Sequence, residues 1–346
     1  MKKTWVRLSL IFLITFVFLF FFFRSVKWKE FFSDLIDINI IFFILIIVLV
    51  PLHLATRAFR WRYLLIHEKK DVKYSNMFAA NAVGFTVTLI FPGRLGELVK
   101  PLYLAQKENV SKGFVMGTVV VERTFDIFAN CFLLGLFVIF KPLYSSYFKG
   151  EKDFSDLYRY GEIAIAIAFF LLILILSLYF FKEKTLSFIV FVLRPFPHKI
   201  SEKIIELSQG FIQGLKFFHS VGNLLVYSLL SIVVWLGINF YYLIFLFAYD
   251  IHPPFFLLLP YTFLVMIGAS IPTPGMVGGF HYFSRVGLVL LFNRDGNPLG
   301  NTEAAAMTTV VHAVQLIVTC LIGYAILWKE KISIFQLKKL GENAKK

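Results

Sequence analysis

Long apolar runs constrain this chain more than any other feature of its sequence. A helix must supply about 20 consecutive apolar residues to cross the hydrocarbon core of a bilayer, and it satisfies its backbone hydrogen bonds internally. Hydrophobic residues make up 58% of the 346 residues, and the chain contains 43 Phe. The sequence therefore predicts an all-α polytopic membrane protein with about six full transmembrane helices, at 5–23, 38–56, 113–140, 161–181, 223–249 and 303–328.

The first apolar run follows a basic head, but no small-residue cleavage site comes after it. We therefore expect a retained span and not a removed signal peptide. Lys and Arg in the loops beside the runs carry the net charge of +14, a distribution that favours membrane orientation and anionic lipid over nucleic acid. Cys131 and Cys320 lie inside apolar runs, which indicates packing and no disulfide framework. No metal and no cofactor are predicted.

Two further apolar stretches, 76–105 and 254–292, are interrupted by the helix-breaking segments "FPGRLGE" and "IPTPGMVGG". Non-helical backbone is tolerated at membrane depth only where protein or a water-filled cavity covers it. The breaks therefore predict a cavity, and the residues expected to form them are Pro92, Gly93, Gly96, Pro272, Pro274, Gly275 and Gly278.

The distribution of Lys and Arg among the loops predicts the orientation of the chain. The loops after the second, fourth and last spans are basic and should be cytoplasmic, whereas those at 141–160 and 293–302 mix charges and suit the outside. Both termini would then be cytoplasmic in a multi-pass protein of the cytoplasmic (inner) membrane. Each interrupted stretch must enter and leave on one side, as a re-entrant helical hairpin. The alternative, that both are ordinary kinked spans, gives about eight spans.

One broken segment in each half, with opposite topology, is typical of a transporter built as an inverted repeat, with its site near the midplane. We expect pseudo-inverted halves at about 1–140 and 161–328. Together they form a single membrane domain over 1–330, and a short basic cytoplasmic tail follows at 331–346.

Charged residues occur where apolar ones are expected. In the first interrupted stretch they are spaced three apart, and in the span at 113–140 they lie about three turns inside, where an unpaired charge costs several kcal/mol. Three cations against three carboxylates predict a network that is buried at least in part, formed by Arg94, Glu97, Lys100, Glu122, Arg123 and Asp126. The network either binds substrate or pins the hairpin to the span, and the two roles are compatible.

Two weaker candidates are histidines in apolar helices and arginines after the second span. His281 and His312 are either hydrogen-bonded core residues or part of a site, and they could sense protons beside a carboxylate. Arg57 and Arg60 lie in "RAFRWRYLL", which indicates an interfacial anchor or, alternatively, capture of a phosphate head group.

Three motifs in this order resemble the lysylphosphatidylglycerol synthase transmembrane-region family, also called flippase-like or YbhN-like proteins. They are "NAVGFTVTLIFPGRLGELVK", "ERTFD" and "PTPGMVGG". The sequence departs from the family at Met276, where a second Gly is usual, and at His281, where an acidic residue is common. Only a short Lys-rich tail follows Trp328, so we do not expect the soluble synthase domain of some members.

The resemblance implies a lipid flippase that moves an amphipathic lipid, either a modified phospholipid or a polyprenyl-linked glycolipid, between leaflets. The predicted partners are membrane lipids; a homo-oligomer and a separate lipid-modifying enzyme stay open. No Walker motif is present, which indicates a gradient or simple equilibration as the driving force. The alternatives are a non-transporting membrane scaffold or regulator, a small-solute or ion transporter, and an intramembrane hydrolase using Ser270. Because no motif supports the hydrolase, the protein is expected not to be an enzyme.

Overall fold

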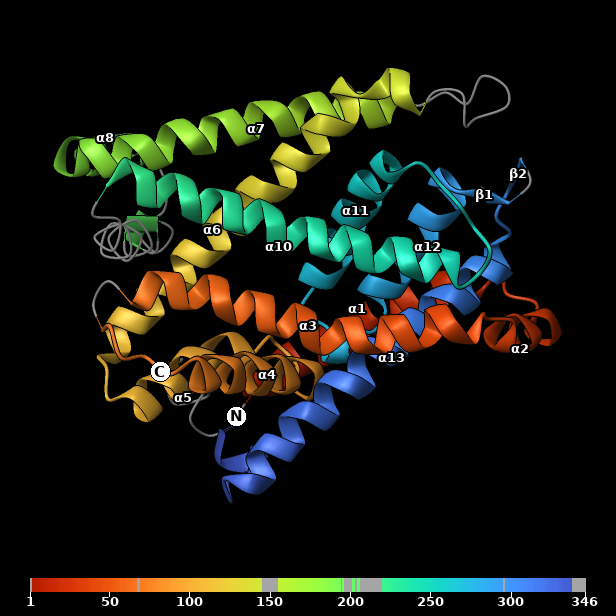
Figure 1. The fold of residues 1–346 in the computed structure, drawn as a ribbon, viewed down its shortest axis with the longest axis horizontal. Coiled ribbons are helices and arrows are strands. Elements are labelled where there is room, and N and C mark those ends of the chain that lie inside the picture. The colour runs from red at the N-terminus through yellow and green to blue at the C-terminus, as the bar shows by residue number, and fades with distance from the viewer. Residues whose placement is uncertain are drawn as a thin grey trace.

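The computed structural model describes residues 2–66, 69–144, 155–193, 195, 201–202, 204–205, 220–294 and 296–337, and most of them are helical (Figure 1). The long helices are α1 (Lys2–Phe23), α3 (Ile40–Leu65), α6 (Lys112–Ile139), α7 (Ser155–Phe180), α10 (Val221–Phe247) and α13 (Asn301–Lys329). The shorter helices are α2 (Trp28–Ile36), α4 (Tyr74–Ile90), α5 (Gly96–Glu108), α8 (Lys182–Leu193), α11 (Leu258–Ser270) and α12 (Gly279–Leu291). Single turns are η1 (Lys141–Leu143), η3 (Phe255–Leu257) and η4 (Pro274–Met276). The only strands within the described ranges, β1 (Asn293–Arg294) and β2 (Asn297–Pro298), pair antiparallel.

The predicted all-α polytopic class is confirmed, and each predicted span coincides with one long helix. In the described part of the chain, α3, α7, α10 and α13 are long and apolar enough to cross a membrane singly, and α1 with α2 makes one candidate span bent by 90°. α6 has 28 residues but carries charges in its middle. The count of six full spans stays a prediction. Residues 145–154 of the loop predicted at 141–160, and residues 338–346 of the tail, lie outside the described residues.

α3 continues well past residue 56, where we expected its span to end, and finishes at Leu65. Ala58, Trp61 and Leu65 follow one another at helical spacing and are fully buried. Continuing the helix therefore buries an apolar stripe. As a result, the arginines of this segment lie on a packed helix and not in a loop at the membrane interface.

The first interrupted stretch is a hairpin of α4 and α5 whose two ends lie together. The Glu108 carboxylate at the end of α5 accepts hydrogen bonds from the Lys73 backbone N (3.1 Å) and Asn76 Nδ2 (2.7 Å) at the start of α4. A glycine pair lets the two helices touch: a Cβ on Gly96 would lie 1.8 Å from the Gly84 carbonyl oxygen. The chain therefore folds back at residues 91–95, and that this hairpin is re-entrant in the membrane stays a prediction.

The second interrupted stretch is a hairpin of α11 and α12 built in the same way. A Cβ on Gly268 would lie 2.4 Å from the Gly279 carbonyl oxygen, so another glycine pair brings the helices together. The rings of Tyr261 and Phe292 pack edge to face at 5.4 Å near the open end of the hairpin. Its break holds Pro272 and η4, and this part of the chain also folds back on itself.

The two hairpins enter the bundle from opposite ends (Figure 1). The open end of the first lies beside the end of α13, where Lys107 Nζ is 2.8 Å from Glu330 Oε1. The second hairpin opens toward the start of α13, where Arg294 Nη2 lies 3.0 Å from Glu303 Oε1. At the same end, Thr302 Oγ1 accepts a hydrogen bond from the Lys27 backbone N (3.1 Å). α1 thus runs opposite to α13, which places the start of α1 and the end of α13 at one end of the molecule.

The tips of the hairpins meet inside the bundle, and their turns have the same local chemistry. Pro92-Gly93-Arg94 and Pro274-Gly275-Met276 are the two turns, and φ is positive at the second and third residue of each: 76° and 53°, then 62° and 60°. Met276 therefore adopts a left-handed conformation that favours glycine. A Cβ on Gly275 would lie 3.1 Å from the Leu89 carbonyl oxygen, so the second tip rests against the end of α4.

Candidate functional site

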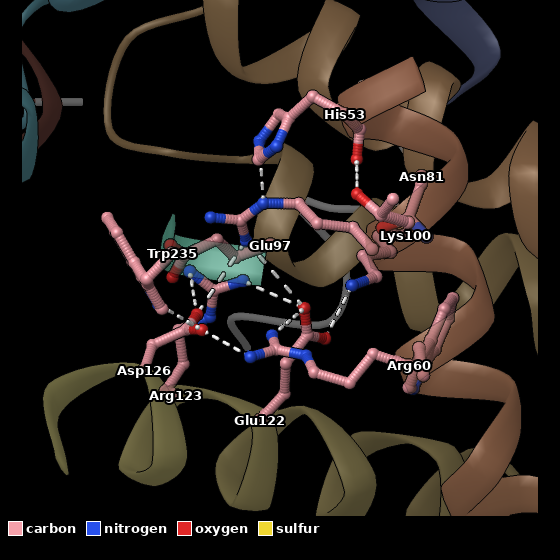
Figure 2. A network of polar contacts seen from close by, with 12 residues as sticks. His53, Arg60, Asn81, Glu97, Lys100, Glu122, Arg123, Asp126 and Trp235 are labelled. Carbon is pink, nitrogen blue, oxygen red and sulfur yellow. Dashed lines mark hydrogen bonds and ion pairs between the residues drawn. The ribbon is translucent and has the colours of Figure 1, made fainter. Parts of the chain in front are cut away.

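A buried ion-pair network joins α3 to α6 (Figure 2). Arg60 Nη1 donates to Asp126 Oδ1 (2.7 Å), and Arg60 Nη2 donates to Glu122 Oε1 (3.1 Å). The two carboxylates are four residues apart on α6 and so share one face of the helix. Arg60 is fully buried, which corrects its interpretation as an interfacial anchor. Both carboxylates are instead held by a guanidinium that no solvent reaches.

α5 adds Lys100 to the same network. Lys100 Nζ lies 2.5 Å from Glu122 Oε2 and 4.1 Å from the centre of the Trp61 ring. A Cβ on Gly84 would come within 2.6 Å of the Lys100 Cβ, so only glycine at this position of α4 leaves room for the lysine. The first hairpin is therefore tied to both α3 and α6 by one ammonium group.

Arg57 and Arg123 approach the same two carboxylates, and each keeps one buried nitrogen without a hydrogen bond to a described residue. Arg57 Nη1 lies 3.7 Å from Asp126 Oδ2, and Arg57 Nε donates to His53 Nε2 (2.9 Å). Arg123 Nη1 is 3.3 Å from Asp126 Oδ2, and Arg123 Nη2 is 3.3 Å from Glu122 Oε1. Arg57 Nη1 and Arg123 Nε are buried and have no hydrogen-bond partner among the described residues.

Arg94 and Glu97 form a separate pair at the tip of the first hairpin. Arg94 Nη2 lies 2.7 Å from Glu97 Oε1, and about a third of each side chain is exposed (31% and 37%). Arg94 Nη1 also reaches the Ser270 carbonyl oxygen of α11 at 3.5 Å. Of the six residues predicted to form one network, Lys100, Glu122, Arg123 and Asp126 are in direct contact, whereas Arg94 and Glu97 pair with each other.

The charged groups border a cavity of about 330 Å³ between the hairpin tips. Its wall comes from α3, α6, α10 and α13 together with both hairpins. The charged residues that line it are Arg57, Arg94, Glu97, Arg123 and Asp126. Ile127 and Ser270 also line the cavity and are exposed on the outside of the bundle, so the cavity reaches the molecular surface between α6 and α11.

The predicted histidines lie together on the hairpin side of this cavity. Their rings meet edge to face with centres 4.6 Å apart, and His312 also stacks on Phe280 at 4.8 Å. His312 lines the cavity, whereas His281 lies behind it. His281 Nδ1 and His312 Nε2 are buried without a hydrogen-bond partner among the described residues. No carboxylate contact is recorded for either ring in the described ranges.

The predicted break residues fall at the turns. Pro92 and Gly93 form the first turn, Gly96 opens α5 against α4, and Pro272 precedes η4. Pro274 and Gly275 lie within η4. Gly278 has φ 93°, and a Cβ there would lie 3.0 Å from the Thr15 carbonyl oxygen. The second tip therefore packs against α1 as well as α4.

The network also has neutral partners that no sequence motif indicated. Trp235 Nε1 on α10 donates to Asp126 Oδ1 (2.9 Å), and His53 on α3 accepts from Arg57. An indole N–H in the middle of an apolar span needs an acceptor, so Trp235 carried a signal. No comparable signal in the sequence indicated that Asp126 would be its acceptor. The described residues contain no group of three or more His, Cys, Asp or Glu side chains placed to hold a metal ion.

Comparison with known proteins assigns the family. A profile described as "Lysylphosphatidylglycerol synthase TM region" matches residues 6–323. The chain is also 26% identical over 145 residues to "UPF0104 membrane protein MJ1595" of Methanocaldococcus jannaschii. That alignment covers 40% of this chain and 43% of the relative, so the chain matches less than half the length of that protein. No solved structure matches. The profile covers the hairpins, the network and the cavity, and the chain therefore belongs to the lysylphosphatidylglycerol synthase transmembrane-region family.

Proposed function

We propose that this protein is a flippase that moves an amphipathic, phosphate-bearing lipid between the leaflets of the cytoplasmic membrane. The supporting observation is the cavity at the meeting point of two oppositely directed hairpins, which is lined by arginines inside an apolar bundle. A polar head group loses its hydration in hydrocarbon, at a cost of several kcal/mol. Fixed charges along its path replace part of that hydration.

Arg57 and Arg123 are the proposed contacts for the phosphate. Each has a buried N–H group, on Nη1 of Arg57 and Nε of Arg123, that makes no hydrogen bond to a described residue. Planar guanidinium groups bind phosphate oxygens through paired hydrogen bonds. The carboxylates of Glu122 and Asp126 hold the same guanidiniums in position, so the structural and binding roles of the network coexist.

The opening of the cavity suits a lipid whose acyl chains stay in the membrane. Ile127, 47% exposed, and Ile267, 37% exposed, present apolar surface on the outside of α6 and α11. Between them the cavity reaches the surface at Ser270. The head group would enter here while the chains remain outside, and the hairpin tips would alternate its access to the two leaflets.

A proteoliposome assay tests the proposal. Vesicles containing the purified chain and a fluorescent phospholipid are treated with a membrane-impermeant quencher, which reaches inner-leaflet lipid only if lipid moves outward. We expect movement with the native chain and a fall in rate of about tenfold or more in Arg57→Gln and in Arg123→Gln, since each removes a charged hydrogen bond.

Lys107→Gln is the matched control, because Lys107 pairs with Glu330 away from the cavity and the variant should retain the native rate. A folded protein that moves no lipid class would support a scaffold or regulatory role instead, and uptake of water-soluble solutes would support a small-solute transporter. Lipids recovered chemically unchanged would agree with a non-enzymatic role. Cleaved lipid would favour the hydrolase, and in that case the Ser270→Ala substitution should abolish the cleavage.

The proposed orientation places the open end of the first hairpin in the cytoplasm. That end of the molecule carries a cluster of basic side chains, Arg62, Lys69, Lys70, Lys73, Lys107, Lys112, Lys329 and Lys331. The opposite end mixes signs, with Lys27 beside Glu30 and Arg294 beside Glu303. By the positive-inside rule, both termini would be cytoplasmic.

A further inference from the structure

The charged groups of the buried network and of the cavity wall, taken together, do not balance. They are Arg57, Arg60, Arg94, Lys100 and Arg123 against Glu97, Glu122 and Asp126, joined pairwise by the contacts described above. With each group in its ordinary charge state, five cations face three carboxylates, and an excess of two positive charges is left. The sequence had indicated three cations against three carboxylates. The two additional cations are Arg57 and Arg60 of α3.

Among the described residues, no other side chain on the cavity wall cancels this excess. The other lining residues are apolar or carry no charge, apart from the two titratable rings of His53 and His312. His53 Nε2 accepts a hydrogen bond from Arg57 Nε, so that nitrogen carries no proton and the ring is neutral. Trp235 uses its N–H on Asp126, which stabilises a carboxylate without adding charge.

An uncompensated excess of this kind is unfavourable inside a membrane protein, because the solvation lost by a buried charge has to be replaced by a counter-charge. Arg57 Nη1 and Arg123 Nε belong to cavity-lining arginines and are buried, and neither nitrogen makes a hydrogen bond to a described residue. Both the charge and the free donors therefore call for an anionic occupant with several acceptor oxygens.

On these grounds we propose that the lipid carried by this protein has a head group with two negative charges, a phosphate monoester. This rests on the proposed function and names its substrate class. A monoester carries about −1.5 to −2 charges at pH 7 and three acceptor oxygens. A phosphodiester lipid neutralises only half of the excess, a zwitterionic lipid neutralises none, and an aminoacylated lipid adds a further cation.

Binding of soluble short-chain lipids to the full-length protein in nanodiscs tests this class. The probes are dioctanoyl phosphatidic acid, phosphatidylglycerol and phosphatidylcholine, measured by calorimetry at low and high salt. We expect phosphatidic acid to bind most tightly, with phosphatidylcholine weaker by about tenfold or more, and we expect salt to reduce the difference. Equal affinities for the three lipids, or tightest binding of phosphatidylcholine, would overturn the proposal.

Two substitutions in the partly exposed Arg94–Glu97 pair change the excess of positive charge in opposite directions without removing a member of the buried network. Arg94→Gln lowers it to one charge and should weaken phosphatidic acid binding, whereas Glu97→Gln raises it to three and should strengthen it. Both side chains are about one-third exposed, so the variants should fold. Lys107→Gln removes one positive charge, as Arg94→Gln does, but at a position away from the cavity. It should leave phosphatidic acid binding unchanged.

The outcomes separate this inference from the proposed function. Selective binding of phosphatidic acid without movement of any lipid would keep the head-group class and reject the flippase. Movement of zwitterionic lipid at the same rate as phosphatidic acid would keep the flippase and reject the class. Weaker binding in Glu97→Gln than in the native chain would contradict the charge argument directly.

Discussion

At the scale of single residues, the site depends on charges that stabilise one another out of reach of water. Arg60 contacts both Asp126 and Glu122 and is fully buried. Breaking a buried pair by removing one partner leaves the other charge without compensation, which is far costlier than losing an exposed pair. The contribution of each ion pair to the stability of this protein is therefore expected to depend on burial more than on the distance between the charged atoms.

Arg60→Gln is expected to destabilise the protein by about 3–5 kcal/mol, because two buried carboxylates lose their closest guanidinium. The measurement is the free energy of unfolding in detergent, by denaturant titration. The matched control is Lys27→Gln, which removes an exposed pair with Glu30 of similar length, 3.1 Å. It should cost less than about 1 kcal/mol. Similar losses for the two variants would contradict a buried role for Arg60.

At the scale of elements, each hairpin depends on a glycine pair where its helices cross. Gly84 with Gly96 and Gly268 with Gly279 bring backbone against backbone. Small residues at helix crossings in membranes permit such close approach and compensate for the weak hydrophobic driving force between helices. This packing holds each tip at the depth of the cavity and presents Arg94 from one side and Met276 from the other.

Gly96→Ala is expected to separate α4 from α5, because its Cβ would lie 1.8 Å from the Gly84 carbonyl oxygen. Overpacking costs about 1–3 kcal/mol or more, so thermal stability in detergent should fall. Gly237→Ala on α10 is the control, since a Cβ there meets nothing within 4 Å. Alanine is the better helix former, so this variant should be neutral or more stable. Equal stability of both variants would argue against close α4–α5 packing.

At the scale of the whole molecule, the proposed function depends on two hairpins that enter from opposite ends and meet at one cavity. The end of α4 touches η4, and Arg94 reaches Ser270. These tip contacts are few compared with the packing within each hairpin. Relative movement of the tips could open the cavity to either side without unfolding a hairpin, which is the arrangement that alternating access needs.

Cysteine labelling tests this arrangement. In a chain with Cys131 and Cys320 replaced by Ala, Lys70→Cys and Lys331→Cys should react with an impermeant maleimide from the same side of the membrane. Lys29→Cys and Asp250→Cys should react only from the opposite side, because α2 and the end of α10 lie at the other end of the bundle. Labelling of Lys70→Cys and Asp250→Cys from one side would disprove the proposed topology.

The sequence alone determined the helical class, the long helices and the two breaks. Apolar length and Pro-Gly chemistry are local properties, so 76–105 and 254–292 could be identified as hairpins before their packing was known. It also determined that Glu122 and Asp126 need partners, because a lone charge in a span is too costly. The predicted end of the span at residue 56 was wrong, because α3 continues to Leu65. Hydropathy does not identify an arginine-rich helical turn that neighbouring helices bury.

Only the tertiary structure decided which partners those charges take. Arg60 lies 62 residues from Glu122 and 66 from Asp126 along the chain, and Trp235 lies 109 from Asp126. No spacing rule connects such distant positions, because the helix period relates neighbours within a helix and not side chains across a bundle. Packing of α3 and α10 against α6 brought these groups together. The same packing turned an expected balance of charge into the positive excess at the cavity.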